Sequence, residues 1–325
     1  MHSPFHSIVG VAVLAVCGCP LGTPKDHYRP HGHQDTTIAI IPADDTILFN
    51  AAGTGGRDLY LLRLTDLTVT RIADTLEYEV SPSFSPDGQR IVYAAGVPGD
   101  RADHIFTIGI DGSSKRQLTD IDANDTSPRF SPDGKMIVFA RDKTYNWGGL
   151  AANWEPGGVI CLIHTAGTGE RQLTSNEIFA FAPAFSQDGK SVIYFTVDGC
   201  FSLALDRSEP PQRIGPLVSY ANLSPDGKRF VYANGKYSPD YELFIANLDG
   251  TGKSQITASD HGCFHPVFTH SGDGIYFLIE EWPQGPSGEP KSSIWTVKTD
   301  GTQQKQITDL SLFDAPHSWK PKLSP

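Results

Sequence analysis

Hydrophobic and polar residues alternate in short runs along this chain, and the runs recur as a longer repeat. The run SPRFSPDGKMIVFARD at residues 127–142 returns in similar form at residues 81–96, 182–197 and 220–235. Alternation with a period of two predicts β-strands. The repeated phrase opens on residues that lie 38 to 55 positions apart: Ile40, Phe84, Phe130, Phe185, Leu223 and Phe268. Six repeats of this length predict stacked or radial units.

Each repeat contains four strand signals, which we call strands a to d in chain order. Strand a is a short P-x-F-S segment, such as residues 128–131, and a Pro-Asp-Gly turn follows it. In such a turn proline fixes φ, aspartate bonds to nearby backbone amides, and glycine accepts a positive φ. We therefore interpret the recurring aspartates as turn residues and not as catalytic groups: Asp87, Asp133, Asp188 and Asp226.

Strands b and c each carry a column of large side chains. The column of strand b consists of Phe49, Tyr93, Phe139, Tyr194, Tyr232 and Phe277. The column of strand c consists of Tyr60, Phe106, Cys161, Phe201, Phe244 and Trp295, in which the cysteine is the one small member. Strand d carries Ile72, Leu118, Leu173, Ile214, Ile256 and Ile307. This pattern predicts an all-β fold, a six-bladed β-propeller of four-stranded antiparallel blades over residues 38–325.

Two segments are candidates for the innermost strand of the first blade. The segment IAII at residues 38–41 has the pattern of an inner strand, and PKLSP at residues 321–325 repeats the opening phrase once more. A ring must join its last blade to its first, because an open sheet edge and an uncovered blade face would otherwise remain. We expect the terminal segment to pair with or beside the first blade, and the pattern leaves open which of the two is innermost.

The N-terminal residues differ from the repeats. Residues 8–19 are an apolar run too short to span a bilayer, and they are typical of a secretory signal that occupies residues 1–19. The sequence VCGC resembles a bacterial lipobox in which Cys19 receives the lipid; plain secretion with cleavage nearby is the alternative. Residues 20–37 are rich in Pro, Gly and His and are interpreted as a flexible linker. The expected location is the periplasm or cell envelope.

Charge and cysteine content narrow the functional classes. The formal net charge of −11 repels phosphate backbones and anionic lipid, so nucleic acid is not an expected partner and the membrane is expected only through a lipid anchor. Three widely separated cysteines remain beyond the signal: Cys161, Cys200 and Cys263. Their odd number and wide spacing do not form a disulfide framework, and we expect each to be a small buried side chain.

The phrases FSPDGKMIVF (residues 130–139) and IFTIGIDGSSKRQLTD (residues 105–120) resemble the repeats of TolB, the propeller protein of the Tol–Pal envelope system. They are also similar to the propeller domains of prolyl oligopeptidases and dipeptidyl peptidases. The resemblance implies an exported six-bladed propeller. It departs from TolB because only a short segment precedes the repeats, and from the peptidases because no G-x-S-x-G motif occurs. Membership of the Tol–Pal system is therefore not implied.

The b–c and d–a connections lie on one face of such a propeller and hold the irregular parts of the sequence. Loops on a rigid scaffold commonly carry function, and aromatic residues in them commonly anchor partners. The expected ligand-binding aromatic residues are Tyr145, Trp147, Trp154, Trp282 and Trp319. The alternative is that such aromatic residues fold back and cover the blade edges.

The d–a loops are expected to add polar groups at the mouth of the central channel: Glu79, Asp125, His261, His265 and His317. The leading hypothesis is a monomeric, non-catalytic scaffold of the bacterial envelope that binds a protein or peptide and needs no cofactor. The rival hypothesis is a polysaccharide lyase in which these histidines hold a divalent metal. The i, i+4 spacing of His261 and His265 does not align their side chains on a loop and strand.

Overall fold

The computed structural model describes residues 38–40, 46–52, 57–73, 79–96, 102–142, 158–176, 178–235, 240–281 and 291–309. All of them belong to the second of the chain's two compact units, residues 36–325. The predicted signal and linker, residues 1–37, lie outside the described residues and remain predictions. Within the described ranges there is no helix with the length and apolar character needed to span a bilayer.

The second unit is built from six four-stranded antiparallel sheets, each made of four consecutive strands. Blade 1 comprises β1 (Ile38–Ile40), β2 (Thr46–Ala52), β3 (Arg57–Arg63) and β4 (Val69–Arg71). Blade 2 comprises β5 (Glu79–Phe84), β6 (Arg90–Gly96), β7 (Asp103–Gly109) and β8 (Arg116–Gln117). Blade 3 comprises β9 (Asn124–Phe130), β10 (Met136–Asp142), β11 (Gly158–His164) and β12 (Arg171–Gln172).

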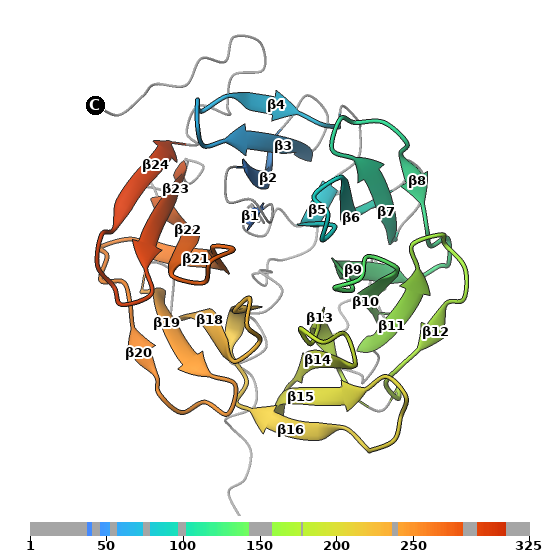
Figure 1. The fold of residues 1–325 in the computed structure, drawn as a ribbon. Helices are drawn as coiled ribbons and strands as arrows, with labels where there is room; N and C mark the ends of the chain where they lie inside the picture. Colours follow the sequence, from blue (N-terminus) through green and yellow to red (C-terminus); the bar gives the residue numbers. More distant parts are fainter. Residues whose placement is uncertain are drawn as a thin grey trace, which may run out of the picture. The chain divides into compact units, whose positions relative to one another are not determined.

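The other three blades have the same order. Blade 4 comprises β13 (Phe181–Phe185), β14 (Ser191–Thr196), β15 (Gly199–Ala204) and β16 (Gln212–Gly215). Blade 5 comprises β17 (Ser219–Leu223), β18 (Arg229–Asn234), β19 (Glu242–Asn247) and β20 (Ser254–Gln255). Blade 6 comprises β21 (Gly262–Phe268), β22 (Gly274–Glu281), β23 (Lys291–Lys298) and β24 (Lys305–Asp309). The predicted six-bladed propeller is confirmed, with strand a of each blade innermost (Figure 1).

The two predicted side-chain columns are direct neighbours in the sheets. In every blade the column residue of strand b is paired in register with that of strand c, from Phe49 opposite Tyr60 to Phe277 opposite Trp295. Four of these pairs are stacked aromatic rings, with centroids 5.6 to 5.9 Å apart. Paired aromatic side chains stabilise neighbouring strands beyond the area that they bury. The columns therefore form the packing surface of each blade.

Blades pack face to face, and the last blade packs on the first. One hydrophobic cluster joins Ile47, Phe49 and Leu62 of blade 1 with Leu278 and Ile294 of blade 6. The innermost strands β1 and β21 are also in contact. The N-terminal segment thus provides the innermost strand of blade 1, which answers the question that the sequence left open. The terminal segment PKLSP, predicted to pair nearby, lies outside the described residues.

The repeated Ser-Pro-Asp-Gly phrase has a structural role. In blade 3 the Ser131 hydroxyl donates to the Asp133 carboxylate and accepts from the backbone amide of Met136. The same carboxylate accepts from the amide of Lys135, and Gly134 has a φ of 69°. The equivalent serine–aspartate bonds occur in blades 2, 4 and 5. The interpretation of the recurring aspartates as turn residues is therefore confirmed.

The repeated Gln-x-Thr sequence at strand d also forms hydrogen bonds with backbone groups. The Thr119 hydroxyl accepts a hydrogen bond from the backbone amide of Ile105 in strand c, while the Gln117 amide donates to the Thr119 carbonyl. The same two bonds recur at Gln172 with Thr174 and at Gln255 with Thr257. These contacts extend the pairing of strands d that are only two residues long, which explains why the phrase recurs.

Acidic pH should lower the stability of the fold, because the aspartates of these turns become protonated. Hydrogen bonds from serine hydroxyls and backbone amides lower the pKa of Asp87, Asp133, Asp188 and Asp226 from the ordinary value of 3.8. A lowered pKa in the folded state gives stability that is present above pH 3.8 and is lost as the pH falls through the lowered values. We expect the melting temperature to decrease below about pH 4, as measured by circular dichroism, and the decrease to be smaller in Asp133→Asn. A melting temperature that rises over this range would contradict the linkage.

Candidate ligand-binding site

The innermost strands of blades 2 to 6 shift register against strand b at the same place, and in four of these blades a residue before proline has a positive φ. Ser81, Ser127, Ala182 and His265 each precede a proline and have φ between 46° and 53°. The pairing between strands a and b shifts register at each of these places. Positive φ is uncommon for residues other than glycine, and a bulge redirects the side chains beside it. Proline is tolerated here because strand a is a sheet edge.

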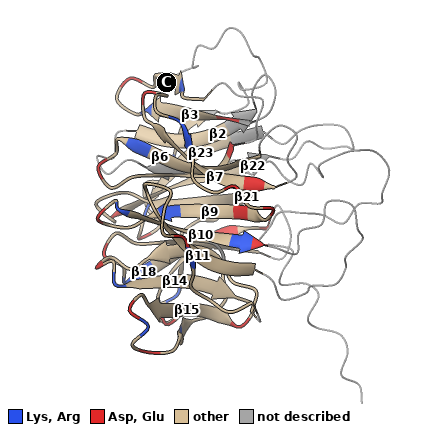
Figure 2. Ribbon diagram, turned by 90° about the vertical axis from the view of Figure 1, so that its right-hand side faces the viewer, with Lys and Arg blue, Asp and Glu red and all other residues tan. Residues whose placement is uncertain are grey.

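Buried charged groups gather at one end of the blades. The Asp, Glu, His and Arg side chains that are buried among the described residues are Asp58, Glu79, His104, Asp125 and Arg141. Each lies where strand a begins, strand b ends or strand c begins, and all belong to blades 1 to 3. We call this set the polar rim. It lies at the end of the blades that carries the b–c and d–a connections; Figure 2 shows a side view coloured by charge.

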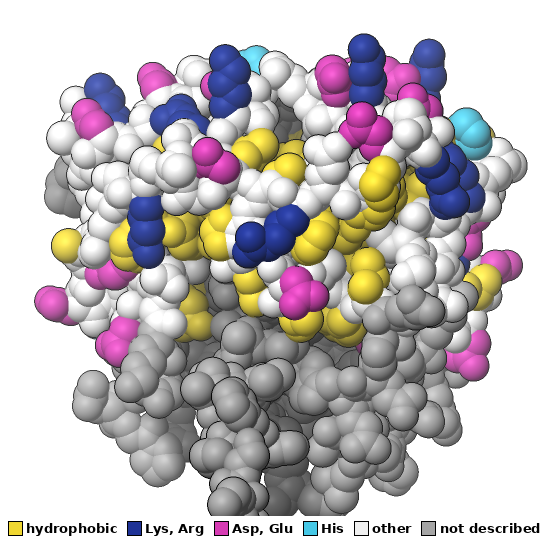
Figure 3. Space-filling view, turned by 90° about the horizontal axis from the view of Figure 1, so that it is seen from below, with side chains coloured by type: hydrophobic (Ala, Val, Ile, Leu, Met, Phe, Trp, Pro, Cys, Tyr) yellow, Lys and Arg dark blue, Asp and Glu magenta, His cyan; other side chains and the backbone are white. Residues whose placement is uncertain are grey.

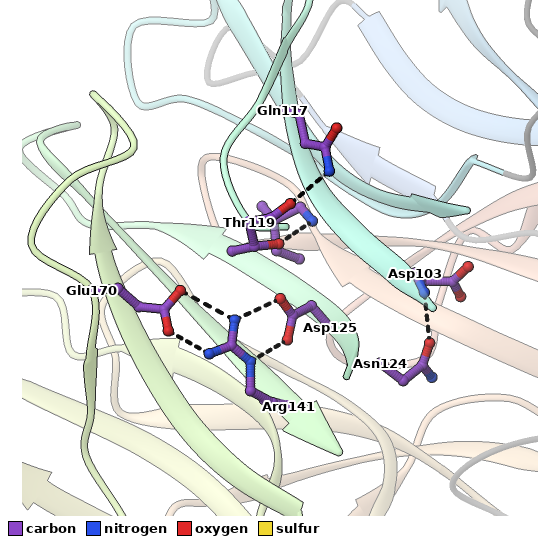
Figure 4. A network of polar contacts seen from close by, with 8 residues as sticks. Asp103, Gln117, Thr119, Asn124, Asp125, Arg141 and Glu170 are labelled. Atoms are coloured by element: carbon purple, nitrogen blue, oxygen red, sulfur yellow. Dashed lines mark hydrogen bonds and ion pairs between the residues drawn. The ribbon is translucent and has the colours of Figure 1, made fainter. Parts of the chain in front are cut away.

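The centre of the polar rim is an ion-pair network in blade 3 (Figure 4). The Arg141 guanidinium binds both oxygens of Asp125, with Nε–Oδ1 at 2.7 Å and Nη2–Oδ2 at 2.8 Å. It also donates to both oxygens of Glu170, through Nη1 to Oε1 and through Nη2 to Oε2 at 3.1 Å. Asp125 and Arg141 face each other across neighbouring strands. A bidentate pair of this kind fixes both side chains.

Burial and the neighbouring charges shift the pKa values of Asp125 and Arg141 in opposite directions. Burial raises the pKa of Asp125, while the hydrogen bonds and charge of Arg141 act in the opposite direction. Burial alone would lower the pKa of Arg141, but its hydrogen bonds to Asp125 and Glu170 raise it above the ordinary value. Arg141 therefore stays a cation and is the counter-ion of two carboxylates.

Polar side chains also link successive blades at this end. The Asn50 amide of blade 1 donates to the Glu79 carbonyl of blade 2 at 3.0 Å. The backbone amide of Asp103 in blade 2 donates to Asn124 of blade 3, also at 3.0 Å. Glu79 and His104 both lie opposite Ala95 in the sheet, so the two side chains flank a small residue on one face. The polar rim is thus continuous from blade 1 to blade 3.

Blade 5 contributes a separate polar group near the start of blade 6. The Glu242 carboxylate accepts from the Thr257 hydroxyl and from the backbone amide of Ser259 at 2.7 Å. Cys263 lies 3.8 Å from this carboxylate, and burial raises the pKa of its thiol to about 12. A thiol with such a pKa is not a nucleophile at neutral pH. The prediction that Cys161, Cys200 and Cys263 are free and buried is confirmed.

The structure corrects the placement of three predicted site residues. Glu79, Asp125 and His265 lie within strands β5, β9 and β21, and not in d–a loops, because strand a begins earlier than the P-x-F-S phrase. Glu79 and Asp125 are fully buried, whereas His261 is exposed just before β21. Among the described residues, no group of three or more His, Cys, Asp or Glu side chains is placed to hold a metal.

The other predicted site residues lie outside the described residues. They are Tyr145, Trp147, Trp154, Trp282, Trp319, His317 and Cys19. One aromatic residue of the b–c connection in blade 5 is described. Tyr241 packs on Phe264 of blade 6, with ring centroids 5.1 Å apart. It therefore covers a blade edge, as the alternative interpretation of the loop aromatic residues expects.

Sequence reasoning missed Arg141, Glu170 and His104. A signal for Arg141 was present, because the equivalent positions of other blades hold Ala51, Ala95, Thr196, Asn234 and Ile279. A charged residue at a position that is uncharged in the other repeats indicates a role that is specific to its blade. Glu170 had no such signal, because it lies in a c–d turn of ordinary composition.

A groove of about 640 Å³ lies at the junction of blades 3 and 4. Its apolar lining includes Leu173, Ile178, Tyr194, Phe201 and Leu203, and its polar lining includes Arg207 and Glu209. Arg207 donates to the Gln172 carbonyl across the two blades at 2.8 Å. Figure 3 views the ring from the side of blade 4 and shows hydrophobic side chains between charged ones on this face.

Two curated proteins show sequence similarity to parts of the chain. The chain is 25% identical over 201 residues to Uncharacterized protein Atu1656 of Agrobacterium fabrum, a match that covers 54% of this chain and 62% of that protein. It is 41% identical over 71 residues to Dipeptidyl-peptidase 5 of Porphyromonas gingivalis, which covers 20% of this chain and 10% of the peptidase. The matches thus span less than two thirds of either relative. No family model matches the sequence.

Solved structures establish the fold. TolB from Acinetobacter baumannii superposes with a TM-score of 0.58 at 16% identity, covering 83% of this chain and 62% of that one. A TolB candidate from Agrobacterium tumefaciens gives 0.57 at 20% identity, covering 76% and 86%. An oligogalacturonate lyase in complex with manganese gives 0.55 at 14% identity, covering 83% and 75%. The chain therefore has the fold of a TolB-type six-bladed β-propeller, which proteins of different activities share.

Proposed function

We propose that this protein is a non-catalytic binding propeller of the bacterial cell envelope, which holds a protein or peptide on the end that carries the polar rim. Export to the envelope, with or without a lipid on Cys19, is part of the proposal. Its fold likeness to TolB supports this class of function, although fold alone does not determine function.

The observation that carries the proposal is the one-sided burial of charge. Burying an ionised group costs free energy unless it is paired, and such groups concentrate at functional sites. In this protein the buried Asp, Glu, His and Arg side chains of the described residues occur at one end of three adjacent blades. The opposite end carries the stereotyped Ser-Pro-Asp-Gly turns, whose polar groups bond to their own backbone. A partner surface is therefore expected at the polar rim.

The test is a pull-down from a bacterial envelope extract with the Trp147→Ala, Trp154→Ala double variant. In the sequence both residues lie between strands b and c of blade 3, the blade that holds Arg141 and Asp125. Aromatic anchors commonly contribute about 2 kcal/mol or more each to binding. We expect the double variant to lose its partners, with binding weakened by at least about tenfold.

The matched control is Lys135→Ala, an exposed side chain in the a–b turn of the same blade. We expect it to retain the partners of the unmodified protein. If the double variant and the control recover the same partners as the unmodified protein, the proposed binding face is wrong.

The rival function is a metal-dependent polysaccharide lyase. The fold likeness to a manganese-bound oligogalacturonate lyase and the place of His265 on an innermost strand support it. Elemental analysis of the purified protein separates the two functions. A stoichiometric divalent metal that the His261→Ala, His265→Ala double variant loses would favour the lyase over the binding propeller.

A further inference from the structure

One position of the innermost strand is partly exposed in five of the blades. In five blades the residue before the last Phe or Leu of strand a is partly exposed. In blades 2, 3, 4 and 6 the Phe that follows this residue and the proline that precedes it are both buried. Strand a is the innermost strand of each blade, with strand b along its outer edge and neighbouring blades in contact with it (Figure 1). The residues at this position are Ser83, Arg129, Ala184, Asn222 and Val267. Asn222 also donates to the Pro266 carbonyl of blade 6, and Val267 packs against the cluster that joins blades 6 and 1.

Arg129 is the charged member of this set. Its guanidinium donates to the carbonyl of Pro128 at 2.8 Å, and no carboxylate of the described residues forms an ion pair with it. Burial, with no opposing charge, lowers its pKa to about 10, so it remains a cation at neutral pH. The residue keeps partial contact with solvent on the innermost strand of its blade.

Two of the other arginines that are shielded from solvent have counter-ions, whereas Arg90 and Arg229 lie over the rings of Phe130 and Phe268. Arg141 binds two carboxylates, and Arg71 binds Asp58 at 2.6 Å. A cation that is shielded from water without a counter-ion costs free energy, so its retention at the axis indicates a ligand that provides the negative charge. The net charge of −11 makes such a local cation distinctive, since the rest of the protein repels anions.

Hydroxyl donors lie on the same and the adjacent innermost strand. Ser127 belongs to β9 with Arg129, and Ser83 and Ser81 belong to β5, which contacts β9. All three serines are partly exposed, and two of them occupy the bulge position. A planar guanidinium with neighbouring hydroxyls matches the geometry of carboxylate and phosphate groups.

We propose that Arg129, with Ser83 and Ser127, forms a binding site at the ring axis for an oxyanion group, a carboxylate or a phosphate, of a ligand that enters along the axis. The site is separate from the polar rim, and the two proposals fail independently. The guanidinium provides the charge and the paired donors, and the serine hydroxyls complete the coordination of the oxyanion.

The experiment titrates the full chain with succinate and, separately, with inorganic phosphate at constant ionic strength, by calorimetry and by thermal unfolding. We expect saturable binding of at least one probe and a melting temperature that rises with its concentration. Arg129→Gln should weaken that binding by at least about tenfold, because it removes a charge-assisted pair. The probe that binds distinguishes a carboxylate ligand from a phosphate ligand.

The matched control is Arg171→Gln, which removes an exposed arginine from the outermost strand of the same blade. It should leave the binding unchanged. Ser83→Asp tests the same idea without removing Arg129, since it places a carboxylate at the equivalent position of the adjacent strand. We expect this variant to melt at a higher temperature and to lose the response to the probe.

Three results would overturn the proposal. The first is that neither probe binds the unmodified protein. The second is that Arg129→Gln binds as tightly as Arg171→Gln. The third, which applies even if Arg129→Gln does not fold, is that Ser83→Asp lowers the melting temperature and keeps the full response to the probe.

Discussion

Replacing Arg141 with methionine is expected to lower the free energy of unfolding by about 3–5 kcal/mol. Asp125 is fully buried and Arg141 is 3% exposed, so the variant leaves a buried carboxylate without its counter-ion. Burial already raises the pKa of Asp125, and loss of the opposing cation raises it further. Urea unfolding at neutral pH measures the loss. The loss should be smaller at acidic pH, where the protonated carboxyl no longer needs a counter-ion.

Two further variants separate a buried charge from a general loss of packing. The Arg141→Met, Asp125→Leu double variant removes both charges and should recover most of the lost stability, because apolar residues of similar volume often replace a buried pair at little cost. Glu170→Gln should cost about 1 kcal/mol or less, because this carboxylate is 34% exposed. If Arg141→Met alone unfolds with unchanged free energy, the network does not stabilise the blade.

The propeller could be predicted because its repeat acts through local rules. A turn of Ser-Pro-Asp-Gly needs only its own residues, and a period of two within a strand sets which side chains face the next blade. The register of Phe49 opposite Tyr60 recurs at the equivalent pair of every blade, although the length of the connection between strands b and c differs from blade to blade. Because the same weak local signals occur in six repeats, together they predict the fold without information on contacts between distant residues.

The polar rim could be predicted only in part. The sequence singles out Asp125 but not its partner Arg141, because pairing across strands depends on register and not on distance along the chain. The start of strand a was also placed too late. The pre-proline residues Ser127 and His265 have positive φ, so the strand continues through a bulge at a place where proline suggests a boundary. Tertiary pairing overrides the local preference there.

The sequence contains a signal for Arg129, but the similarity of the repeats makes this signal easy to overlook. Arg129 lies inside the phrase SPRF, where the equivalent blades have SPSF, APAF and HPVF. Aligning the repeats draws attention to what they share, whereas a site on the symmetry axis depends on the member that differs. Arg141 in FARD is a second example of the same effect. Departures from the repeat, rather than the repeat itself, mark both candidate sites.

Truncating Phe49 to alanine should open the ring between blades 1 and 6. Phe49 is fully buried, stacks on Tyr60 and packs in the cluster that joins blade 1 to Leu278 and Ile294 of blade 6. Removing a buried phenylalanine side chain costs about 3–5 kcal/mol. This interface is the one between the first and last blades, so no direct chain connection holds the two blades together once the packing is lost. Urea unfolding measures the loss of free energy.

Phe139→Ala is the matched control for ring closure. Phe139 occupies the equivalent position of blade 3, is also fully buried, and packs toward blade 2. A short connection joins blades 2 and 3, so local opening there is limited by the chain. Hydrogen exchange should therefore show faster amide exchange in β2 and β22 of Phe49→Ala than of Phe139→Ala. Equal exchange in the two variants would mean that the junction of blades 1 and 6 is no weaker than the others.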